Sequence, residues 1–455
     1  MKCPSCTAEL KFDSKDQLVK CDYCGSEFNP NELDVEAKKA VASKETYEGI
    51  SYSCSQCGAS LLTFDETAIT FCSYCGSQSM IEEKMIKRNC PEFIIPFKKT
   101  KEECITAYKQ KLSSSFFSPK RMKDDIVVSK FRGIYIPYCV YKLSCHGNVT
   151  NKGKKYSHRV GDYVYYNNYN IRARIDADYD GISYDMISNI YDRFSHAIPH
   201  KFNEAEEFNV NYLAGYYADT SDVDDSIYED NASLVAVEDS MHRLRKIRAY
   251  SRYGCDSPKA AFTVSDKKIG MFPLYFLAIR NKANTYVNYA VVNGQTGEVV
   301  LDIPVDFKKY IIASILLTIP IFLVINSCLV LVPKTVCIIS IISATISLII
   351  SLTQANCIHY REYKLDDEGY MDKNKSTKKI KRKSYFMYMI KQIIGILLGL
   401  FVIVMNFVND SYYYGAASII FILVILSFYD LIKEHNLLVS SKLPQLEKRG
   451  GSENE

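Results

Sequence analysis

The chain has 455 residues, which is enough for several domains, and its formal net charge at pH 7 is +4. That charge excludes a strongly basic chain of the kind that binds nucleic acid over its whole surface. The mean hydropathy of −0.10 averages two unlike parts, because long apolar runs gather in the last third of the chain.

The chain begins with eight cysteines that form one pattern written twice. Each set has two Cys-x-x-Cys pairs separated by 14 residues, and the second set follows the first by 51 positions. This spacing is typical of a tetrahedral four-thiolate zinc site, in which each of two tight turns supplies two ligands. We expect two Zn²⁺ ions, one per set, bound by Cys3, Cys6, Cys21 and Cys24 and by Cys54, Cys57, Cys72 and Cys75.

Two small β zinc ribbons are therefore expected at residues 1–29 and 51–80, with residues 30–50 as a linker. Neither ribbon is large enough to hold a core without its metal. A glycine suits the position after the second cysteine of a pair because it accepts a positive φ, and the first pair departs from this with Thr7. Disulfides would need an oxidising compartment, and no secretory signal is visible at residues 1–4. An iron–sulfur or rubredoxin-like iron site uses similar turns and stays an alternative.

Residues 90–306 are expected to form an α+β domain with a mostly antiparallel sheet. A helix is predicted over residues 100–112, with Thr100 as its N-cap and Glu103 completing a capping box. The segment 156–175 alternates as an antiparallel strand pair would, and residues 293–297 predict a turn between two strands.

Four apolar runs follow, at about residues 310–332, 335–353, 385–408 and 412–432. Crossing a bilayer takes about 20 apolar residues, so these runs predict an all-α, four-helix transmembrane region over residues 307–433, followed by a polar tail over 434–455. The short connections at 333–334 and 409–410 predict two helical hairpins. Lys and Arg gather in the loop 358–384 and in the tail, so this loop, both termini and the ribbons are expected on the cytoplasmic side of a multi-pass protein of the cell membrane.

Several motifs carry a resemblance to a known family. Besides both cysteine sets, they are Ile94-Ile-Pro-Phe97, Phe117-x-Pro119, Gly133-Ile-Tyr-Ile-Pro-Tyr138, Tyr212-Leu-Ala-Gly-Tyr-Tyr-Ala-Asp219 and Asn293-Gly-Gln-Thr-Gly-Glu298. Over roughly residues 1–310 the chain resembles bacterial membrane proteins described as TFIIB-type zinc-ribbon-containing, some of which are labelled primosomal helicases. The resemblance implies zinc and a membrane location but no known reaction. The helicase label does not suit this chain, which has no G-x-x-x-x-G-K-[ST] loop for ATP phosphates.

No enzyme activity is expected, because no HExxH or GxSxG motif names a catalytic metal or a nucleophile. Asp176, Asp178 and Asp180 have the spacing of half a calcium loop, but the last ligand is missing, so a solvated acidic turn is expected. Cys145, His146 and His158 could ligate a metal, although buried thiols and hydrogen-bonded imidazoles are commoner.

We expect an adaptor or scaffold whose helices lie in the lipid bilayer and whose zinc ribbons bind a protein partner. Membrane-tethered nucleic-acid binding is an alternative, disfavoured because two four-thiolate zinc sites would bring the formal charge of +4 near zero. The second ribbon also has no Lys or Arg between residues 53 and 80. A component of an oligomeric transport assembly is a further alternative, and an oligomer is possible in any of these roles.

Overall fold

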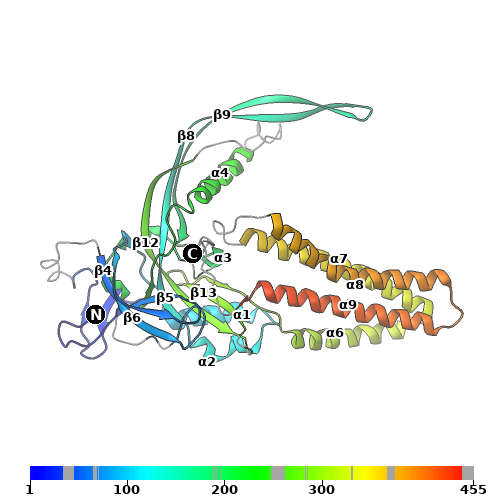
Figure 1. Ribbon diagram of the computed structural model, residues 1–455, viewed down its shortest axis with the longest axis horizontal. Coiled ribbons are helices and arrows are strands. Elements are labelled where there is room, and N and C mark those ends of the chain that lie inside the picture. Colours follow the sequence, from blue (N-terminus) through cyan, green and yellow to red (C-terminus); the bar gives the residue numbers. More distant parts are fainter. Residues whose placement is uncertain are drawn as a thin grey trace.

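The computed structural model describes the chain apart from residues 34–45, 65–68, 70, 188–189, 191, 196, 247–261, 282, 284, 329–331, 366–374 and 443–455. The N-terminal part folds into a sheet domain, and a bundle of long helices projects from one side of that domain (Figure 1). A two-stranded arm leaves the same domain and arches away from it (Figure 1). The chain is therefore multidomain, as expected.

The first cysteine set lies on a small sheet of its own. This sheet is antiparallel and consists of β1 (Leu10–Asp13), β2 (Leu18–Cys21) and β3 (Glu27–Phe28). We call residues 1–33 cysteine unit 1. Phe12 and Val19 are buried on this sheet and join the main hydrophobic core, so the unit is docked on the domain.

The second cysteine set is part of the main sheet. Its strands are β4 (Thr46–Cys54), β5 (Ser60–Thr63) and β6 (Met80–Asn89), and we call residues 46–89 cysteine unit 2. β5 pairs with β11 (Tyr217–Asp219), which pairs in turn with β8 (Arg132–Val160). β4 pairs with β6 along almost its whole length. The sheet thus runs through residues 81–89, where the sequence suggested a boundary between a ribbon and a separate α+β domain.

Twelve strands make up the main sheet, with the central order β10-β7-β12-β8-β11-β5-β4-β6. The remaining members are β7 (Phe93–Ile94), β9 (Tyr163–Asp185), β10 (Glu206–Glu207), β12 (Thr263–Arg280), β13 (Tyr286–Asn293), β14 (Val299–Leu301) and β15 (Ser441–Lys442). β11 with β8 and β12 with β7 are parallel pairs, and the other described pairs are antiparallel. The sheet is therefore mixed and mostly antiparallel.

Two segments that each place a proline beside an aromatic residue, 133–138 and 270–275, lie side by side at the centre of this sheet. β8 and β12 are antiparallel neighbours, with Gly133 opposite Tyr275 and Tyr138 opposite Gly270. Side chains alternate between the two faces of a strand. Tyr135 packs on Phe97 in the core that contains cysteine unit 1, whereas the flanking isoleucines of β8 pack in the core that contains cysteine unit 2. The cysteines of the two sets therefore pack in cores on opposite faces of one sheet.

Short helices cover the sheet. They are α1 (Lys101–Ser113), η2 (Lys120–Lys123), α2 (Asp125–Val128), α3 (Asp192–Ser195), η3 (Phe202–Glu204), η4 (Val210–Leu213) and α4 (Glu229–Lys246). The predicted capping box of α1 is confirmed: Glu103 N donates to Thr100 Oγ1 at 3.2 Å, and Thr100 N donates to Glu103 Oε2 at 2.8 Å. The predicted strand pair around residues 293–297 is confirmed as β13 and β14.

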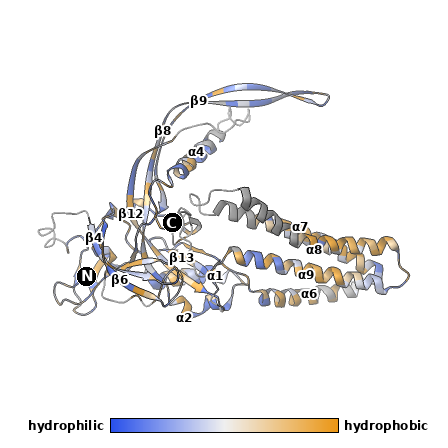
Figure 2. Ribbon diagram, viewed as in Figure 1, coloured by the Kyte–Doolittle hydropathy of each residue, from blue (hydrophilic) through white to orange (hydrophobic). Residues whose placement is uncertain are grey.

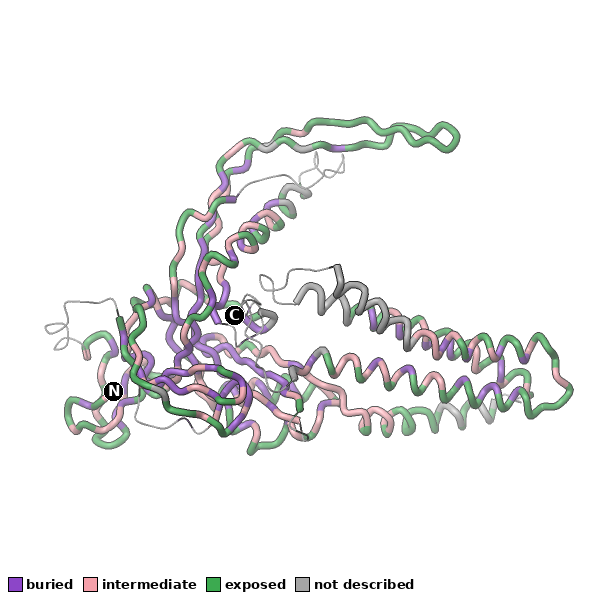
Figure 3. The backbone as a smooth tube through the Cα atoms, in the orientation of Figure 1, coloured by how far each residue is buried: buried purple, intermediate pink, exposed green. Residues whose placement is uncertain are grey.

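The arm is the distal part of β8 and β9, whose pairing extends from Tyr138 and Asp185 to Val160 and Tyr163. Its outer half is exposed (Figure 3). The acidic segment expected as a turn lies in β9 instead, where Asp176 contacts His146 Nδ1 and Asp178 Oδ1 lies 3.2 Å from His146 Nε2. A strand forms there because the segment pairs with β8 residue by residue. His158 stacks on Tyr165 farther along the arm, away from His146, so the arm gathers no metal site from these histidines.

Four helices follow in the described residues: α6 (Phe307–Cys328), α7 (Pro333–Leu365), α8 (Lys375–Met405) and α9 (Ser411–Leu438). The parts of these helices that Figure 2 colours are mostly apolar. Within the segment 358–384, expected as a loop between the two hairpins, α7 continues to Leu365 and α8 begins at Lys375. Lys and Arg are good helix formers, so the basic residues from Lys375 onward form the first turns of α8.

Two of these helices, Pro333–Cys357 and Ser411–Leu437, are long and apolar enough to cross a membrane. In the most apolar 18-residue stretch of each helix, only 22% and 28% of the stretch is buried. A core helix of a soluble protein would be mostly buried. Between α7 and α8, Gln392 Nε2 donates to Ser347 Oγ at 3.0 Å, and Lys391 forms an ion pair with Asp430 of α9.

The start of α6 and the end of α9 both contact residues outside the bundle. At the start of α6, Asp306 N donates to the Phe117 carbonyl at 2.8 Å. At the end of α9, Asn436 Nδ2 donates to the Val305 carbonyl at 2.9 Å. The chain then forms β15 on the edge of β13, so the expected polar tail begins later than residue 434. The first residue of α6 and the last residues of α9 therefore lie at the same end of the bundle.

Candidate metal centres

The structure brings the four cysteines of each predicted set together. The Sγ atoms of Cys3 and Cys24 are 3.7 Å apart and those of Cys6 and Cys21 are 3.4 Å apart. In the second set, Cys54 lies 3.6 Å from Cys75, and Cys57 lies 3.6 Å from Cys72. All four sulfurs of each set lie within 4.8 Å of one another.

These distances suit a metal ion rather than disulfides. A disulfide bond is about 2.05 Å long. Four thiolates placed tetrahedrally at about 2.3 Å from one ion have sulfurs about 3.8 Å apart. Both sets are therefore positioned to hold one metal ion each, and they share no ligand.

The four Cys-x-x-Cys turns have the same backbone geometry. In each, the residue after the second cysteine donates its N–H to the carbonyl of the first cysteine, at 2.8 to 2.9 Å. That residue has a positive φ in all four turns: Gly25, Gly58 and Gly76 lie at 69° to 73°, and Thr7 lies at 63°. The predicted need for a positive φ is confirmed, and Thr7 meets it without the freedom of a glycine. Thr7 Oγ1 donates to the Cys6 carbonyl at 2.6 Å, which holds this conformation.

The thiolate is the metal-binding form of cysteine, and close neighbours shift the pKa values of the ligand thiols in both directions. The Ser26 side chain, 3.2 Å from Cys24 Sγ, lowers the pKa of Cys24 to about 6. In the second set the thiols act on one another: Cys57 and Cys72 lower the pKa of Cys54, and Cys54 raises the pKa values of Cys57 and Cys72.

Cysteine unit 2 is embedded in the domain. Its four cysteines are all buried, and Tyr74, which lies between Cys72 and Cys75, is fully buried as well. The Tyr74 hydroxyl donates to the carboxylate of Asp219 on β11, and its ring packs on Phe276 of β12 at 5.2 Å. The metal turn is thus bound to two strands of the main sheet.

Arg280, at the end of β12, contacts the same turn. Its Nε donates to the Cys75 carbonyl, and its Nη2 lies 2.6 Å from Gln56 Oε1 and 3.5 Å from Cys75 Sγ. A hydrogen bond to a ligand sulfur orients that ligand and stabilises its negative charge. Neither Arg280 nor Asp219 was predicted from the sequence as part of a metal centre, because both are distant in the chain from the cysteines.

Cysteine unit 1 lies at the surface of the same domain. Phe12 N donates to the Ala214 carbonyl at 2.9 Å, and the Phe12 ring packs on Tyr212 at 5.2 Å. The outer turn faces solvent: Cys24 is exposed, and Tyr23, the counterpart of Tyr74, is 83% exposed. Two units of nearly the same sequence pattern therefore differ in burial.

Comparison with known proteins adds one relative. No family model matches the chain, and no solved structure matches it. The chain is similar to the uncharacterized protein YdjG of Bacillus subtilis (strain 168), with 26% identity over 324 residues. The match covers 68% of this chain and 91% of YdjG. It brings no function, since YdjG is itself described as uncharacterized.

The two metal centres should respond differently to loss of one ligand. We expect Cys21→Ser to reduce the metal content from two ions to one and leave the main sheet folded, because the two sets share no ligand. Cys72→Ser should also remove one ion but should lower the thermal stability of the whole domain, because cysteine unit 2 is part of its sheet. Elemental analysis and thermal unfolding of the purified protein measure both effects. If Cys21→Ser empties both centres, the assignment of ligands is wrong.

The strain at Thr7 gives a second prediction. A left-handed conformation costs a residue other than glycine about 1 kcal/mol or more, so Thr7→Gly should slow the release of metal from cysteine unit 1 to a chelator. Gly25→Thr is the matched reverse change, because a Cβ at Gly25 has no atom within 4 Å and only the backbone would be strained. That variant should speed release from the same unit. Equal release rates for the two variants would contradict this account of the turns.

Proposed function

We propose that this protein is a zinc-binding integral membrane protein of the TFIIB-type zinc-ribbon group, with a non-enzymatic role as an adaptor or scaffold. The observation that carries the proposal is the different burial of the two cysteine units. Cysteine unit 2 is built into the sheet, whereas cysteine unit 1 offers an exposed metal turn with Tyr23 at its surface. Exposed aromatic residues on a rigid turn suit protein recognition. Unit 2 then serves stability and unit 1 serves partner binding.

Zinc is the metal that best suits the two centres. Zn²⁺ accepts four thiolates in a tetrahedron, has no redox chemistry and is the usual metal of small structural sites. The sulfur separations of 3.4 to 3.7 Å support such a site. The reduced state of the cysteines also agrees with a cytoplasmic location for both units.

A four-helix membrane region with cytoplasmic termini is the arrangement we propose for the bundle. Apolar side chains of α6 such as Ile315, Leu316 and Leu323 are at least 56% exposed, which suits contact with lipid. Both ends of the bundle's chain contact the sheet domain, which suits an even number of crossings. The Lys and Arg residues at the start of α8 suit the positive-inside rule.

Thiol labelling tests this topology. The variants Lys334→Cys, Lys375→Cys and Asp410→Cys would each be made in a chain that lacks the three cysteines of the bundle and keeps the eight metal ligands. A membrane-impermeant thiol reagent added to intact cells should label positions 334 and 410 and leave position 375 unlabelled. The reverse pattern would place the cysteine units outside the cell and overturn both the topology and the reduced zinc sites.

Membrane-tethered nucleic-acid binding is a second candidate, and the arm is the observation that favours it. Its outer part exposes five tyrosines: Tyr156, Tyr163, Tyr165, Tyr166 and Tyr169. Lys and Arg residues are interspersed among them, at positions 152, 154, 155, 159, 172 and 174. Aromatic rings and cations on one ribbon are the usual elements of single-strand binding.

Two matched tyrosine variants separate these candidates. Tyr23→Ser changes cysteine unit 1 and Tyr163→Ser changes the arm, and both side chains are at least 76% exposed, so neither variant should unfold the protein. After crosslinking in cells and purification from membranes, we expect Tyr23→Ser to lose captured protein and Tyr163→Ser to keep it. Loss in Tyr163→Ser alone, with captured material that nuclease removes, would instead establish the second candidate.

A further inference from the structure

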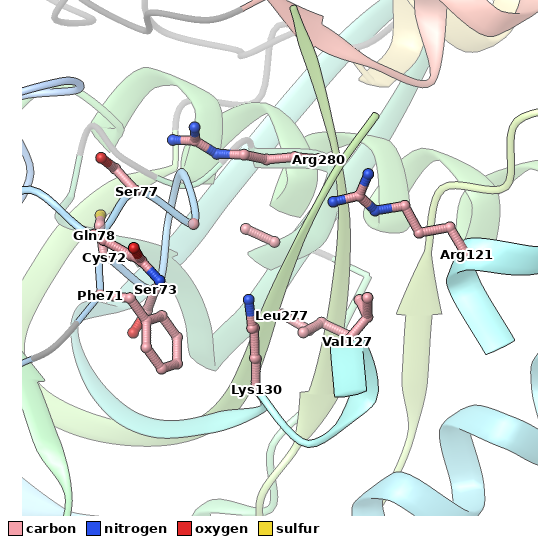
Figure 4. A pocket seen from close by; sticks show the side chains of 12 residues that line it. Phe71, Cys72, Ser73, Ser77, Gln78, Arg121, Val127, Lys130, Leu277 and Arg280 are labelled. Carbon is pink, nitrogen blue, oxygen red and sulfur yellow. The ribbon is translucent and has the colours of Figure 1, made fainter. Parts of the chain in front are cut away.

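A cavity of about 260 Å³ lies beside cysteine unit 2. One wall is the second metal turn, from Phe71 to Gln78, and another is the end of β12 around Ala278. The third wall is the segment of η2 and α2, with the residues that follow it. Figure 4 shows three cationic side chains around this space: Arg280 from the wall of β12, and Arg121 and Lys130 from the third wall.

Arg280 is fixed in place by the metal turn. Its Nε and Nη2 atoms are hydrogen-bonded to the Cys75 carbonyl, to Gln56 and to Cys75 Sγ. Within the described residues, Nη1 has no acceptor. The guanidinium group is therefore held rigidly, with one nitrogen left for a ligand, and little side-chain entropy would be lost on binding.

The lining of the cavity offers the other two cations no acidic side chain. The twelve residues that line the cavity contain no Asp or Glu. Neither Arg121 nor Lys130 forms an ion pair with a described residue, although Lys130 Nζ lies 6.0 Å from the centre of the Phe71 ring. The Arg132 guanidinium lies over the same ring at 4.7 Å. A four-thiolate zinc centre beside the cavity would carry a net charge of −2, and Arg280 is already bonded to one of its sulfurs, so Arg121 and Lys130 are the cations left to attract an anion.

Lys101 is a further cation close to this group. Burial, and next the charge of Arg132, lower the pKa of Lys101. Its ammonium group donates to the carbonyl of Ser129, which adjoins Lys130, at 2.7 Å. Positive charge therefore accumulates at this side of the domain.

Ser73 supplies a buried polar group in the wall of the cavity. It is 4% exposed, and its Oγ has no hydrogen-bond partner among the described residues. Buried hydroxyl groups are nearly always hydrogen-bonded, so an orphan hydroxyl that lines a cavity indicates a missing partner. The hydroxyl oxygen is itself buried, so it would reach an anion in the cavity after the side chain rotates about χ1.

We propose that this cavity is a phosphate-binding site that takes a phosphate monoester. Arg280, Arg121, Lys130 and Ser73 present donors from several directions, which suits the tetrahedral oxygens of a phosphate better than a planar carboxylate. The ester part has room in a cavity of about 260 Å³, which is far larger than one phosphate group.

The phosphate could belong to a soluble metabolite or to a lipid headgroup. The segment that carries Arg121 also contacts the foot of the helical bundle: the carbonyls of Phe117 and Ser118 accept hydrogen bonds from Asp306 N and Lys309 Nζ. The site is therefore close in the chain to the region proposed to meet the membrane. The chemistry recognised is the same for both sources.

Calorimetric titration of the full-length, metal-loaded protein tests the site. The protein would be held in nanodiscs of a neutral lipid and titrated with glycerol 3-phosphate and, separately, inorganic phosphate. Arg121→Gln and Lys130→Gln should each weaken binding about tenfold, because each removes a charge-assisted hydrogen bond. Lys123→Gln is the matched control: it lies on the same turn as Arg121 and does not line the cavity, so it should change the affinity less than about twofold.

Ser73→Ala separates a ligand contact from a structural role. It should weaken glycerol 3-phosphate binding and leave the metal content at two ions. Nanodiscs that contain phosphatidic acid distinguish the sources: if this lipid blocks the soluble ligand, the headgroup is the occupant, and if the soluble affinity is unchanged, a metabolite is. The proposal is wrong if the wild-type protein binds neither phosphate compound at about 10 mM, or if Arg121→Gln binds as tightly as Lys123→Gln.

Discussion

The burial of four cysteine sulfurs inside the main sheet is the constraint on which the rest of this structure depends. The sulfurs of cysteine unit 2 lie within 4.8 Å of one another and all four residues are buried. Without a metal, thiolates so close together would repel one another, and thiols would leave the two turns without a link. The turns join β4, β5 and β6, and β11 connects these strands to β8. Metal binding is therefore coupled to the whole domain, and not only to a small ribbon.

One segment of the chain connects both metal units to the core. Tyr212 and Ala214 hold Phe12 of cysteine unit 1, and Asp219 accepts the hydrogen bond of Tyr74 in cysteine unit 2. Between these contacts, Tyr216 stacks on Phe97 with ring centres 4.1 Å apart. The Phe97 ring also packs directly on Gly294. A Cβ at position 294 would lie 2.3 Å from this ring, so there is no room for a side chain. Three of the motifs that carried the resemblance, those that contain Tyr135, Tyr216 and Gly294, thus converge in space around Phe97.

The sequence predicted those parts of the fold that depend on local chemistry. Cysteine spacing grouped the ligands correctly, the capping box located α1, and the Asn-Gly-Gln-Thr-Gly turn located β13 and β14. It did not predict that cysteine unit 2 lies in the main sheet, because that position depends on β11, more than a hundred residues away. Tyr23 and Tyr74 occupy matching positions, yet one is 83% exposed and the other is fully buried. No local pattern distinguishes them, since burial is decided by the strand that each unit meets. Arg280 was missed for the same reason: its partners are separated from it by about two hundred residues.

The two metal units lie at different places relative to the helical bundle, and this difference has consequences for what each can do. Cysteine unit 1 lies at the end of the domain farthest from the bundle (Figure 1). Cysteine unit 2 faces the segment next to the bundle across the cavity. Cys75 contacts Arg280 in one wall, and another wall contains Arg121, whose segment binds the start of α6 through the Phe117 carbonyl. A partner on cysteine unit 1 would therefore be held away from the bundle. A ligand in the cavity would instead bridge three parts of the chain: the metal turn of cysteine unit 2, the end of β12 and the segment of η2 and α2. Its binding free energy would stabilise the arrangement in which these three parts lie together.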